Sequence, residues 1–332
     1  MAESKTLLLT GGAGFVGHHV AEGVLKNTDW KIVIIDRLDI SGNTRRLTDI
    51  DIWEKEKHRV RFIWWDLKAQ ISDSVRKEIG QVDYIWHLAA SSHVDRSIAD
   101  PMSFVMDNMV GTCNLLNYAR TLPTLKQFIN FSTDEVFGPA PEGVNYKEWD
   151  RYKSGNPYAA SKAGAEELCL SFQNTYKLPV IITHTMNIYG ERQHPEKFIP
   201  MTIRKVLSGE KVLIHSDKTK SKSGSRMWIH ARNVCSALLF LTEKGLPGDK
   251  YNIVGEKEVS NLEMAKFIAK VIGKDLNYEM VDFHSSRPGH DLRYSLDGEK
   301  MRDMGWNMPK TFEQSLEKTI RWTLENQEWL NI

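Results

Sequence analysis

A tyrosine and a lysine stand four residues apart in the segment Tyr158-Ala-Ala-Ser-Lys162. This spacing places both side chains on one face of a helix. A lysine ammonium beside a phenol favours the phenolate, so the pair predicts a phenol whose pKa falls from its usual value of about 10 toward neutral pH. Such a phenol can accept the proton of a substrate hydroxyl while a hydride leaves the same carbon for a nicotinamide. The spacing therefore indicates oxidation of an alcohol.

A hydroxyl and two adjacent carboxylates form a second group of candidates, Thr133, Asp134 and Glu135, at the end of a strand-like segment. Alone, an Asp-Glu pair at a strand end is typical of a solvated turn. Beside Thr133, which could contact the same substrate oxygen as the tyrosine, the pair indicates acid–base work, because neighbouring carboxylates in different environments can hold different protonation states. An elimination needs both a base and an acid, and this pair offers both.

A glycine-rich turn, Gly11-Gly12-Ala13-Gly14-Phe15-Val16-Gly17, follows the first strand-like segment and opens a helical one. The glycines at 11, 14 and 17 allow a tight turn, the approach of a pyrophosphate and close helix–strand packing, and the helix N-terminus favours the anion. Asp36 ends the second strand-like segment, where a carboxylate binds the adenosine ribose and repels a 2′-phosphate. We therefore expect NAD as the cofactor, although Arg37 would suit NADP. Further expected cofactor contacts are Asp66, Leu67 and Ala89.

Short apolar runs alternate with amphipathic stretches through the first half of the chain. The runs predict strands at 5–10, 31–36, 60–65, 82–88, 127–132 and 179–185, and helices are expected at 15–25, 103–122, 158–176 and 311–325. Strands that are apolar throughout and separated by helices indicate a parallel sheet covered on both faces. We predict an α/β fold with a Rossmann-type doubly wound sheet. Residues 1–185 would form the NAD-binding domain with the catalytic residues, and 186–332 mainly a smaller substrate-binding lobe with segments that return to the large domain.

Composition argues against several classes of protein. The 332 residues include 44 Lys and Arg against 43 Asp and Glu, so the basic surplus usual in proteins that bind nucleic acid or anionic membranes is missing. No apolar stretch approaches the ~20 residues needed to span a bilayer, and the N-terminus leaves no room for a signal peptide. Three widely spaced cysteines and 11 histidines without zinc-ligand spacing predict neither a disulfide framework nor a metal site. We expect a cytoplasmic enzyme that binds neither nucleic acid nor a membrane.

Several longer motifs resemble those of the nucleotide-sugar 4,6-dehydratases, above all the dTDP-glucose 4,6-dehydratases, within the extended short-chain dehydrogenases/reductases. TDEVFG at 133–138 is similar to the family's TDEVYG. The stretches DRLDISGNTRRL at 36–47, HLAASSHVDRSI at 87–98, the NxYG…PEK run at 187–197 and RPGHDLRY at 287–294 also follow the family's order. Because these motifs span nearly the whole chain, the resemblance is specific.

The resemblance implies a redox elimination on a nucleotide-linked hexose. Tyr158, supported by Thr133 and Lys162, would take the proton of the sugar 4-hydroxyl as the hydride leaves C4. Glu135 would remove the C5 proton, Asp134 would protonate the departing C6 hydroxyl, and the hydride would return to C6. The resemblance also implies a homodimer through the helices at 103–122 and 158–176. It assigns the substrate to Ser92, His93, Asn187, Glu196, Lys197, Arg226, Asn252, Arg287, His290 and Tyr294.

The chain also departs from the family's pattern, mostly where the nucleotide should be recognised. Phe137 replaces a tyrosine, and the segment SRMWIHARN surrounds Arg226 after an unusual Lys/Ser-rich loop at 217–225. The base of the substrate therefore stays open between dTDP-glucose and UDP-glucose. A sugar-nucleotide 4-epimerase or decarboxylase of the same fold remains an alternative, because neither reaction requires Asp134 and Glu135. A catalytically silent NAD-binding protein is the other alternative, although it would not need Thr133, Tyr158 and Lys162 together.

Overall fold

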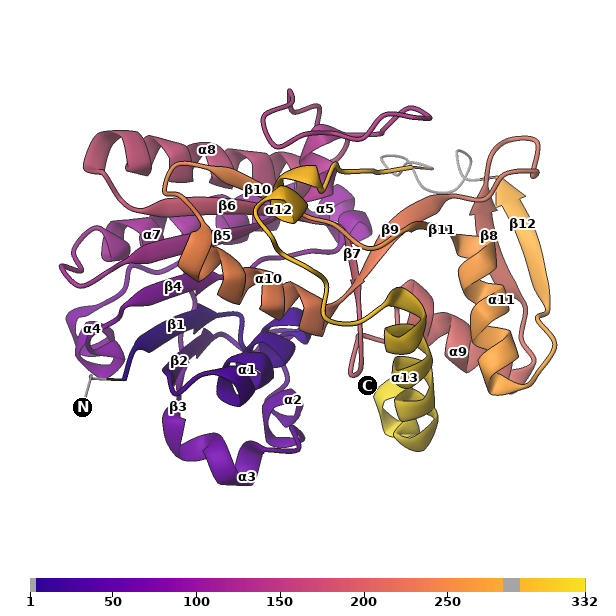
Figure 1. The fold of residues 1–332 in the computed structure, drawn as a ribbon, viewed down its shortest axis with the longest axis horizontal. Helices are drawn as coiled ribbons and strands as arrows, with labels where there is room; N and C mark the ends of the chain where they lie inside the picture. Colours follow the sequence, from indigo (N-terminus) through magenta and orange to yellow (C-terminus); the bar gives the residue numbers. More distant parts are fainter. Residues whose placement is uncertain (1–3, 283–292, 332) are drawn as a thin grey trace.

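The computed structural model describes residues 4–282 and 293–331, which form a large sheet-containing lobe and a smaller lobe beside it (Figure 1). The large lobe is built on seven strands, hydrogen-bonded in the order β10-β6-β5-β4-β1-β2-β3, and every neighbouring pair is parallel. The strands are β1 (Thr6–Thr10), β2 (Lys31–Asp36), β3 (Val60–Trp64), β4 (Tyr84–His87), β5 (Gln127–Thr133), β6 (Val180–Thr185) and β10 (Lys250–Ile253). The predicted Rossmann-type α/β fold is confirmed. Of these seven strands, β10 is the one that was not predicted from the sequence.

Helices cover both faces of this sheet. Helices α1 (Phe15–Asn27) and α10 (Ala231–Lys244) pack on one face, and α4 (Asp73–Ile79), α7 (Gly111–Ala119) and α8 (Pro157–Tyr176) pack on the other. Within β1, Leu7 and Leu9 pack toward α1 and α10, whereas Leu8 packs toward α7 and α8, and all three are fully buried. Side chains alternate between the faces of a strand, so a sheet covered on both faces needs strands that are apolar throughout.

The helix expected at 103–122 has a different geometry from the one predicted. Its run begins earlier with α6 (Pro101–Phe104), passes through the π-helical segment η2 (Val105–Val110) and continues as α7 to Ala119. In the π-helical segment, the Asn108 amide donates to the Ser91 carbonyl and the Ser161 hydroxyl, and its oxygen accepts the Ser91 N–H. These contacts link the segment to the loop after β4 and to α8. π-Helical turns of this kind occur frequently at functional sites.

The smaller lobe is made of two small sheets and three helices. One sheet has the order β11-β9-β7 and the other pairs β12 with β8 in parallel. Buried side chains such as Ile203, Met264 and Leu316 join its helices in a separate core. The strands are β7 (Asn187–Tyr189), β8 (Val212–Ser216), β9 (Ser225–His230), β11 (Glu258–Ser260) and β12 (Tyr278–Asp282), and the helices are α9 (Phe198–Ser208), α11 (Asn261–Ile272) and α13 (Phe312–Glu325). The domain boundary at residue 185 stays a prediction.

Short helical turns connect the larger elements. They are α2 (Arg45–Thr48), α3 (Trp53–Glu56), η1 (Lys57–Arg59), α5 (Val94–Ala99), η3 (Asp134–Phe137), α12 (Glu299–Asp303) and η4 (Gln327–Leu330). Within residues 4–282 and 293–331, no helix combines the length and the apolar character needed to cross a membrane.

The order of the strands determines where a ligand can bind. Strand β1 lies between β2 and β4 and is hydrogen-bonded to both. In open parallel sheets of this kind, ligands bind in the crevice beyond the carboxyl ends of the strands at the point where the order reverses. The glycine turn follows β1, Asp36 ends β2 and Thr133 ends β5, so all three lie at that edge.

Candidate active site

A single cavity of about 380 Å³ extends along this edge of the sheet. The glycine turn and Asp36 line the same cavity as Tyr158 and Lys162. Among the residues predicted to act, Thr133, Asp134, Glu135, Tyr158 and Lys162 all line it, as do Gly11, Gly14, Phe15, Val16, Gly17, Asp36, Asp66, Leu67 and Ala89. Side chains that are far apart in the sequence therefore share one cavity, which contains both the glycine turn and the candidate catalytic residues.

The glycine turn fits a dinucleotide pyrophosphate. A Cβ on Gly17 would lie 2.0 Å from the Gly11 carbonyl oxygen, and Gly11 has a φ of +73°, so both positions require glycine. Gly14 caps α1 without a side-chain hydrogen bond, and the first turn of α1 contains no acidic residue. The amide groups at the start of α1 are thus available to an anion, which the helix dipole also favours.

Asp36, at the end of β2, is held in place by two backbone hydrogen bonds. Its carboxylate accepts the backbone N–H groups of Ala13, at 3.0 Å, and Leu38, at 2.9 Å. Burial raises the pKa of this carboxyl, and the two backbone hydrogen bonds oppose that rise. This placement matches a ribose-binding carboxylate, so the residues present fit NAD. In the described part of the chain, no three His, Cys, Asp or Glu side chains gather as a metal site.

Tyr158 differs from the sequence-based expectation in one respect. The pKa of its phenol is raised, not lowered, because the side chain is buried and the Glu135 and Asp134 carboxylates lie nearby. A hydrogen bond with Thr133 lowers the pKa but does not compensate. Lys162 donates to the Phe131 carbonyl oxygen at 2.7 Å, so its ammonium is bonded to the end of β5. The prediction that a lysine ammonium beside Tyr158 lowers the phenol pKa is therefore wrong.

The ammonium of Lys162 is balanced by a buried carboxylate one helical turn later. Burial lowers the pKa of Lys162 to about 8, and the negative charge of Glu166 opposes this shift. Glu166 is itself fully buried, lies 3.0 Å from His184 Nε2 and accepts the hydroxyls of Ser132 and Tyr152. This network keeps Glu166 ionised, because its partners outweigh the burial that would raise its pKa. Glu166 was not predicted from the sequence, although its position four residues after Lys162 was available as a signal.

The two carboxylates of the chemical site occupy different environments. Burial, and then the charge of Glu135, raise the pKa of Asp134 to about 7. One carboxyl oxygen of Asp134 accepts the Thr133 hydroxyl at 3.1 Å, and the other, Oδ2, is buried without a hydrogen-bond partner within the described protein. Glu135 instead accepts the amide of Asn156, 2.9 Å away. A carboxyl group that titrates near neutral pH therefore stands next to a hydrogen-bonded carboxylate.

Asn156 is a second residue that the sequence reasoning missed. Its side-chain oxygen caps α8 by accepting the Ala159 N–H at 2.8 Å, while its amide nitrogen donates to Glu135. An Asn directly before Pro157 and a helical segment is a recognisable N-cap signal. Only the fold shows that the same side chain orients a candidate catalytic carboxylate.

The residues predicted to bind the substrate are only partly brought together. Ser92, Asn187 and Lys197 line the cavity. Glu196 pairs with Arg96 at 3.0 Å and lies 3.5 Å from His93, and both Glu196 and His93 are outside the lining. Arg226 stacks on Tyr294 at 4.9 Å from the ring centroid, and its charge acts on Asp134. The predicted substrate residues Arg287 and His290 lie outside the described residues.

Asn252 has a structural role in place of the predicted contact with the diphosphate. It is fully buried in β10 and absent from the cavity lining. Its amide donates to the carbonyl oxygens of Tyr146 and Asp297, each at 3.0 Å, and its oxygen lies 3.0 Å from His184 Nδ1. The side chain therefore joins β10 to two neighbouring loops, and its polar atoms are already satisfied by the protein.

Comparison with known proteins places this site in a defined family. Residues 8–319 match the family model described as GDP-mannose 4,6 dehydratase. A dTDP-glucose 4,6-dehydratase from Escherichia coli is 35% identical over 350 residues, which cover 97% of this chain and 94% of that protein. A dTDP-glucose 4,6-dehydratase from Streptomyces venezuelae, solved with NAD bound, superposes with a TM-score of 0.87 at 34% identity and 98% coverage of both chains. A UDP-glucose 4-epimerase from Thermus thermophilus, solved with NAD, superposes with a TM-score of 0.85 at 26% identity, covering 95% of this chain and 98% of that one.

Proposed function

This chain belongs to the GDP-mannose 4,6 dehydratase family, and we propose that it is an NAD-dependent dTDP-glucose 4,6-dehydratase, a hydro-lyase that forms the 4-keto-6-deoxy sugar nucleotide. One observation carries the proposal beyond membership of the family. A carboxyl group with a pKa of about 7, Asp134, and a second carboxylate, Glu135, line the same cavity as Tyr158 and Lys162. Dehydration needs all three functions in one place, namely an alcohol base, a carbon base and an acid.

The cofactor and the protein divide the chemistry between them. Bound NAD supplies the acceptor that takes a hydride from sugar C4 and returns it to C6, and the positive charge of its oxidised ring favours the ionised form of a nearby phenol. Tyr158 takes the proton of the 4-hydroxyl in the first step. Thr133 hydrogen-bonds the phenol, and the positive charge of Lys162 stabilises the negative charge that develops on it. The resulting 4-ketone makes the C5 proton acidic enough for a carboxylate to remove.

Glu135 and Asp134 would carry out the elimination. Glu135, oriented by Asn156, takes the C5 proton and gives it back to C5 when the hydride returns to C6. Asp134 gives its proton to the C6 hydroxyl, which leaves as water. A pKa of about 7 suits this role, because a general acid works best when its pKa lies near the working pH. The buried, unpartnered Oδ2 of Asp134 fits a group whose hydrogen-bond partner arrives with the substrate.

The same carboxylates argue against the alternative reactions. A 4-epimerase or a decarboxylase of this fold would use the tyrosine and the cofactor but has no step for a protonated Asp134. Keeping a carboxyl group buried beside a second carboxylate is costly for the folded protein, because both burial and the neighbouring charge disfavour ionisation. In an elimination, the raised pKa that results supplies the general acid. A silent NAD-binding protein would gain nothing from it.

The proposal includes a homodimer. Apolar side chains are exposed along the helical run from α5 to η2, where Ile98 is 41% exposed, Met102 66% and Met106 38%. This run packs against α8. Met106 lies within the helix at 103–122 that the resemblance assigns to a dimer interface, and Ile98 and Met102 come just before it. A cytoplasmic location also belongs to the proposal and fits the three free cysteines, since secreted proteins of this size usually pair theirs.

A substrate panel followed by mass spectrometry tests the function. The protein, supplied with NAD, is incubated separately with dTDP-glucose and UDP-glucose, and kcat/KM is compared. We expect dTDP-glucose to lose one water, with the larger kcat/KM. An unchanged mass with an altered sugar would assign the chain to the epimerases. A larger kcat/KM for UDP-glucose would overturn the assignment of dTDP as the nucleotide of the substrate. No turnover of either compound would overturn the proposal. A reaction without protein serves as the control.

A further inference from the structure

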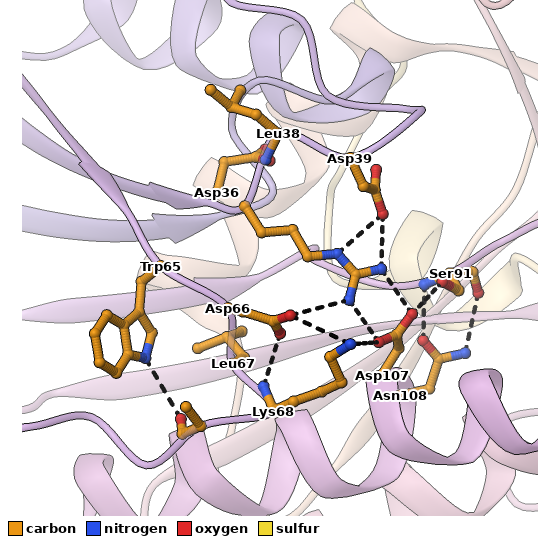
Figure 2. Close-up of polar contacts among 12 residues, drawn as sticks. Asp36, Leu38, Asp39, Trp65, Asp66, Leu67, Lys68, Ser91, Asp107 and Asn108 are labelled. Atoms are coloured by element: carbon orange, nitrogen blue, oxygen red, sulfur yellow. Dashed lines mark hydrogen bonds and ion pairs between the residues drawn. The ribbon is translucent and has the colours of Figure 1, made fainter.

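Arg37, the residue that would suit NADP, lines the adenosine end of the cavity and lies within 4 Å of three carboxylates. These are Asp39, Asp66 and Asp107, which Figure 2 labels. Its guanidinium donates to Asp39 from Nε at 3.0 Å and from Nη2 at 2.7 Å. The same group donates to both oxygens of Asp107, from Nη1 at 2.6 Å and from Nη2 at 2.7 Å. Asp66 lies 3.6 Å from Nη1. The cation is therefore engaged along two of its edges.

This arrangement uses most of what the guanidinium can offer a ligand. Arginine has five N–H donors in a rigid fork, and a bidentate pair with a carboxylate uses two of them in parallel. The contacts with Asp107 form such a pair, and the contacts with Asp39 use Nε and the second hydrogen of Nη2. The pKa of Arg37 is raised, above all by the hydrogen bond with Asp107, so the group is always charged but its charge is already paired.

Asp107 is held in position by other contacts. It lies in the π-helical segment η2, and its carboxylate also accepts the Ser91 hydroxyl at 2.6 Å. The next residue, Asn108, hydrogen-bonds the backbone N–H and carbonyl of the same Ser91. Burial alone would raise the pKa of Asp107, but the hydrogen bonds from Arg37 and Ser91 lower it. The carboxylate is therefore ionised and pre-oriented toward Arg37, so little side-chain freedom remains to be lost.

The charge around this end of the cavity is unfavourable for an additional phosphate. Four carboxylates line this end, Asp36, Asp39, Asp66 and Asp107, against three cations, Arg37, Arg46 and Lys68. Lys68 itself lies 3.3 Å from Asp66, and the charge of Asp36 acts on Arg46. Arg46 also lines the cavity, but it donates to the backbone carbonyls of Ser41 and Arg192. A 2′-phosphate would bring negative charge next to Asp36, where an unpaired arginine is the usual means of accommodating it.

We propose that Asp107, together with Asp39, is a specificity-determining residue for the cofactor, because it holds the Arg37 guanidinium away from the 2′-phosphate of NADP. Asp36 accounts for repulsion of that phosphate, whereas Asp107 removes the attraction that Arg37 would otherwise provide. The inference rests on the proposed function only in taking the Asp36 end of the cavity as the adenosine site. It depends on no step of the dehydration.

Cofactor binding to the full-length protein stripped of nucleotide tests this proposal. Dissociation constants for NAD and NADP are measured by titration calorimetry for the wild type, Asp107→Asn and Asp39→Asn/Asp107→Asn. Since one hydrogen bond to a charged group changes affinity about tenfold or more, we expect the ratio of NADP to NAD affinity to rise about tenfold in Asp107→Asn and further in the double variant. An unchanged ratio in both variants would overturn the proposal. If Asp107→Asn does not fold, Asp39→Asn alone must raise the ratio.

A second substitution distinguishes two ways in which Asp107 could disfavour NADP. One is the pairing of Arg37 by Asp107, called the clamp below, and the other is direct repulsion of the 2′-phosphate by the Asp107 charge. Adding Arg37→Gln to Asp107→Asn should abolish the gain for NADP, because the released guanidinium supplies the new contact. If the gain persists without Arg37, Asp107 acts only through its negative charge and the clamp is refuted. Glu54→Gln, whose side chain is 81% exposed on α3, removes a carboxylate elsewhere and should leave the ratio as in the wild type. Dehydration of dTDP-glucose is assayed in parallel, so failure of the proposed function and failure of the clamp are distinguishable.

Discussion

Replacing Asp134 by asparagine should make the protein more stable relative to the wild type as the pH rises, while it removes the proposed acid. The pKa of Asp134 in the folded protein is about 7, against 3.8 for an unperturbed aspartate. The folded state therefore binds this proton more tightly than the unfolded chain. The contribution of Asp134 to stability is consequently fully present below about pH 4, is lost as the pH rises toward 7, and changes no further above that value.

The size of the effect follows from the same two values. Each pKa unit corresponds to about 1.4 kcal/mol, so the shift of about three units costs the folded protein about 4 kcal/mol above pH 7. Between pH 5 and pH 8, linkage predicts that the wild type loses about 2–3 kcal/mol of unfolding free energy relative to Asp134→Asn. Because the prediction concerns the change in this difference with pH, the intrinsic cost or gain of the amide cancels.

Urea-induced unfolding of the nucleotide-free protein, followed by circular dichroism at several pH values, measures this quantity. Asp73→Asn removes a carboxylate that is 98% exposed on α4 and controls for the loss of an acid at the surface. A difference between wild type and Asp134→Asn that stays constant with pH, or that changes in favour of the wild type, would refute the reasoning. Turnover of Asp134→Asn should fall about 10²–10⁴-fold, the usual contribution of a general acid. In the wild type, kcat should decline above pH 7, because the acid then loses its proton.

Three further predictions follow from the site and the surface. Glu135→Gln should still reduce bound NAD, visible as NADH absorbance, but form product about 10²–10⁴-fold more slowly, and normal product formation would remove Glu135 from the mechanism. Tyr158→Phe should abolish the NADH signal itself, so an undiminished signal would show that another group takes the first proton. Met102→Asp/Met106→Asp should shift the protein from dimer to monomer in light scattering, because it places charge in the exposed apolar stripe, and a retained dimer would place the interface elsewhere.

Sequence analysis located the motifs that lie within one strand end or one helix. The glycine turn, Asp36, the TDE run and the Tyr158–Lys162 pair each depend on a single βα unit, whose hydrophobic period indicates both the strand and the helix. Once the sheet is parallel, all of them lie at its carboxyl edge and line one cavity. Their convergence follows from topology, which is why a prediction about fold class also predicted the core of the site.

Contacts between distant elements were not predictable in the same way. Asp107 reaches Arg37 across 70 positions, and Asn252 reaches His184 across 68. Such pairs depend on the register of strands and on the π-helical widening at η2, neither of which has a local sequence signal. The same limit explains why Arg37 was read as favourable for NADP and Asn252 as a ligand. Residue type alone does not show whether a polar group is already satisfied by another part of the chain.

The chemistry of the proposed elimination also depends on information that adjacent residues do not carry. Asp134 and Glu135 have similar intrinsic acidities, and nothing in their order says which should hold a proton. The short turn η3 directs Asp134 into the buried interior, whereas Glu135 meets the amide of Asn156 at the start of α8. Burial then raises the pKa of one carboxyl, and the amide supplies a hydrogen bond to the other. An acid and a base can thus be made from two neighbouring carboxylates by one turn of backbone, provided that α8 presents Asn156 opposite that turn. Asn156→Ala should therefore leave Glu135 without the contact that orients it. Product should then form more slowly while bound NAD is still reduced, which NADH absorbance measures, although Asn156 never exchanges a proton itself.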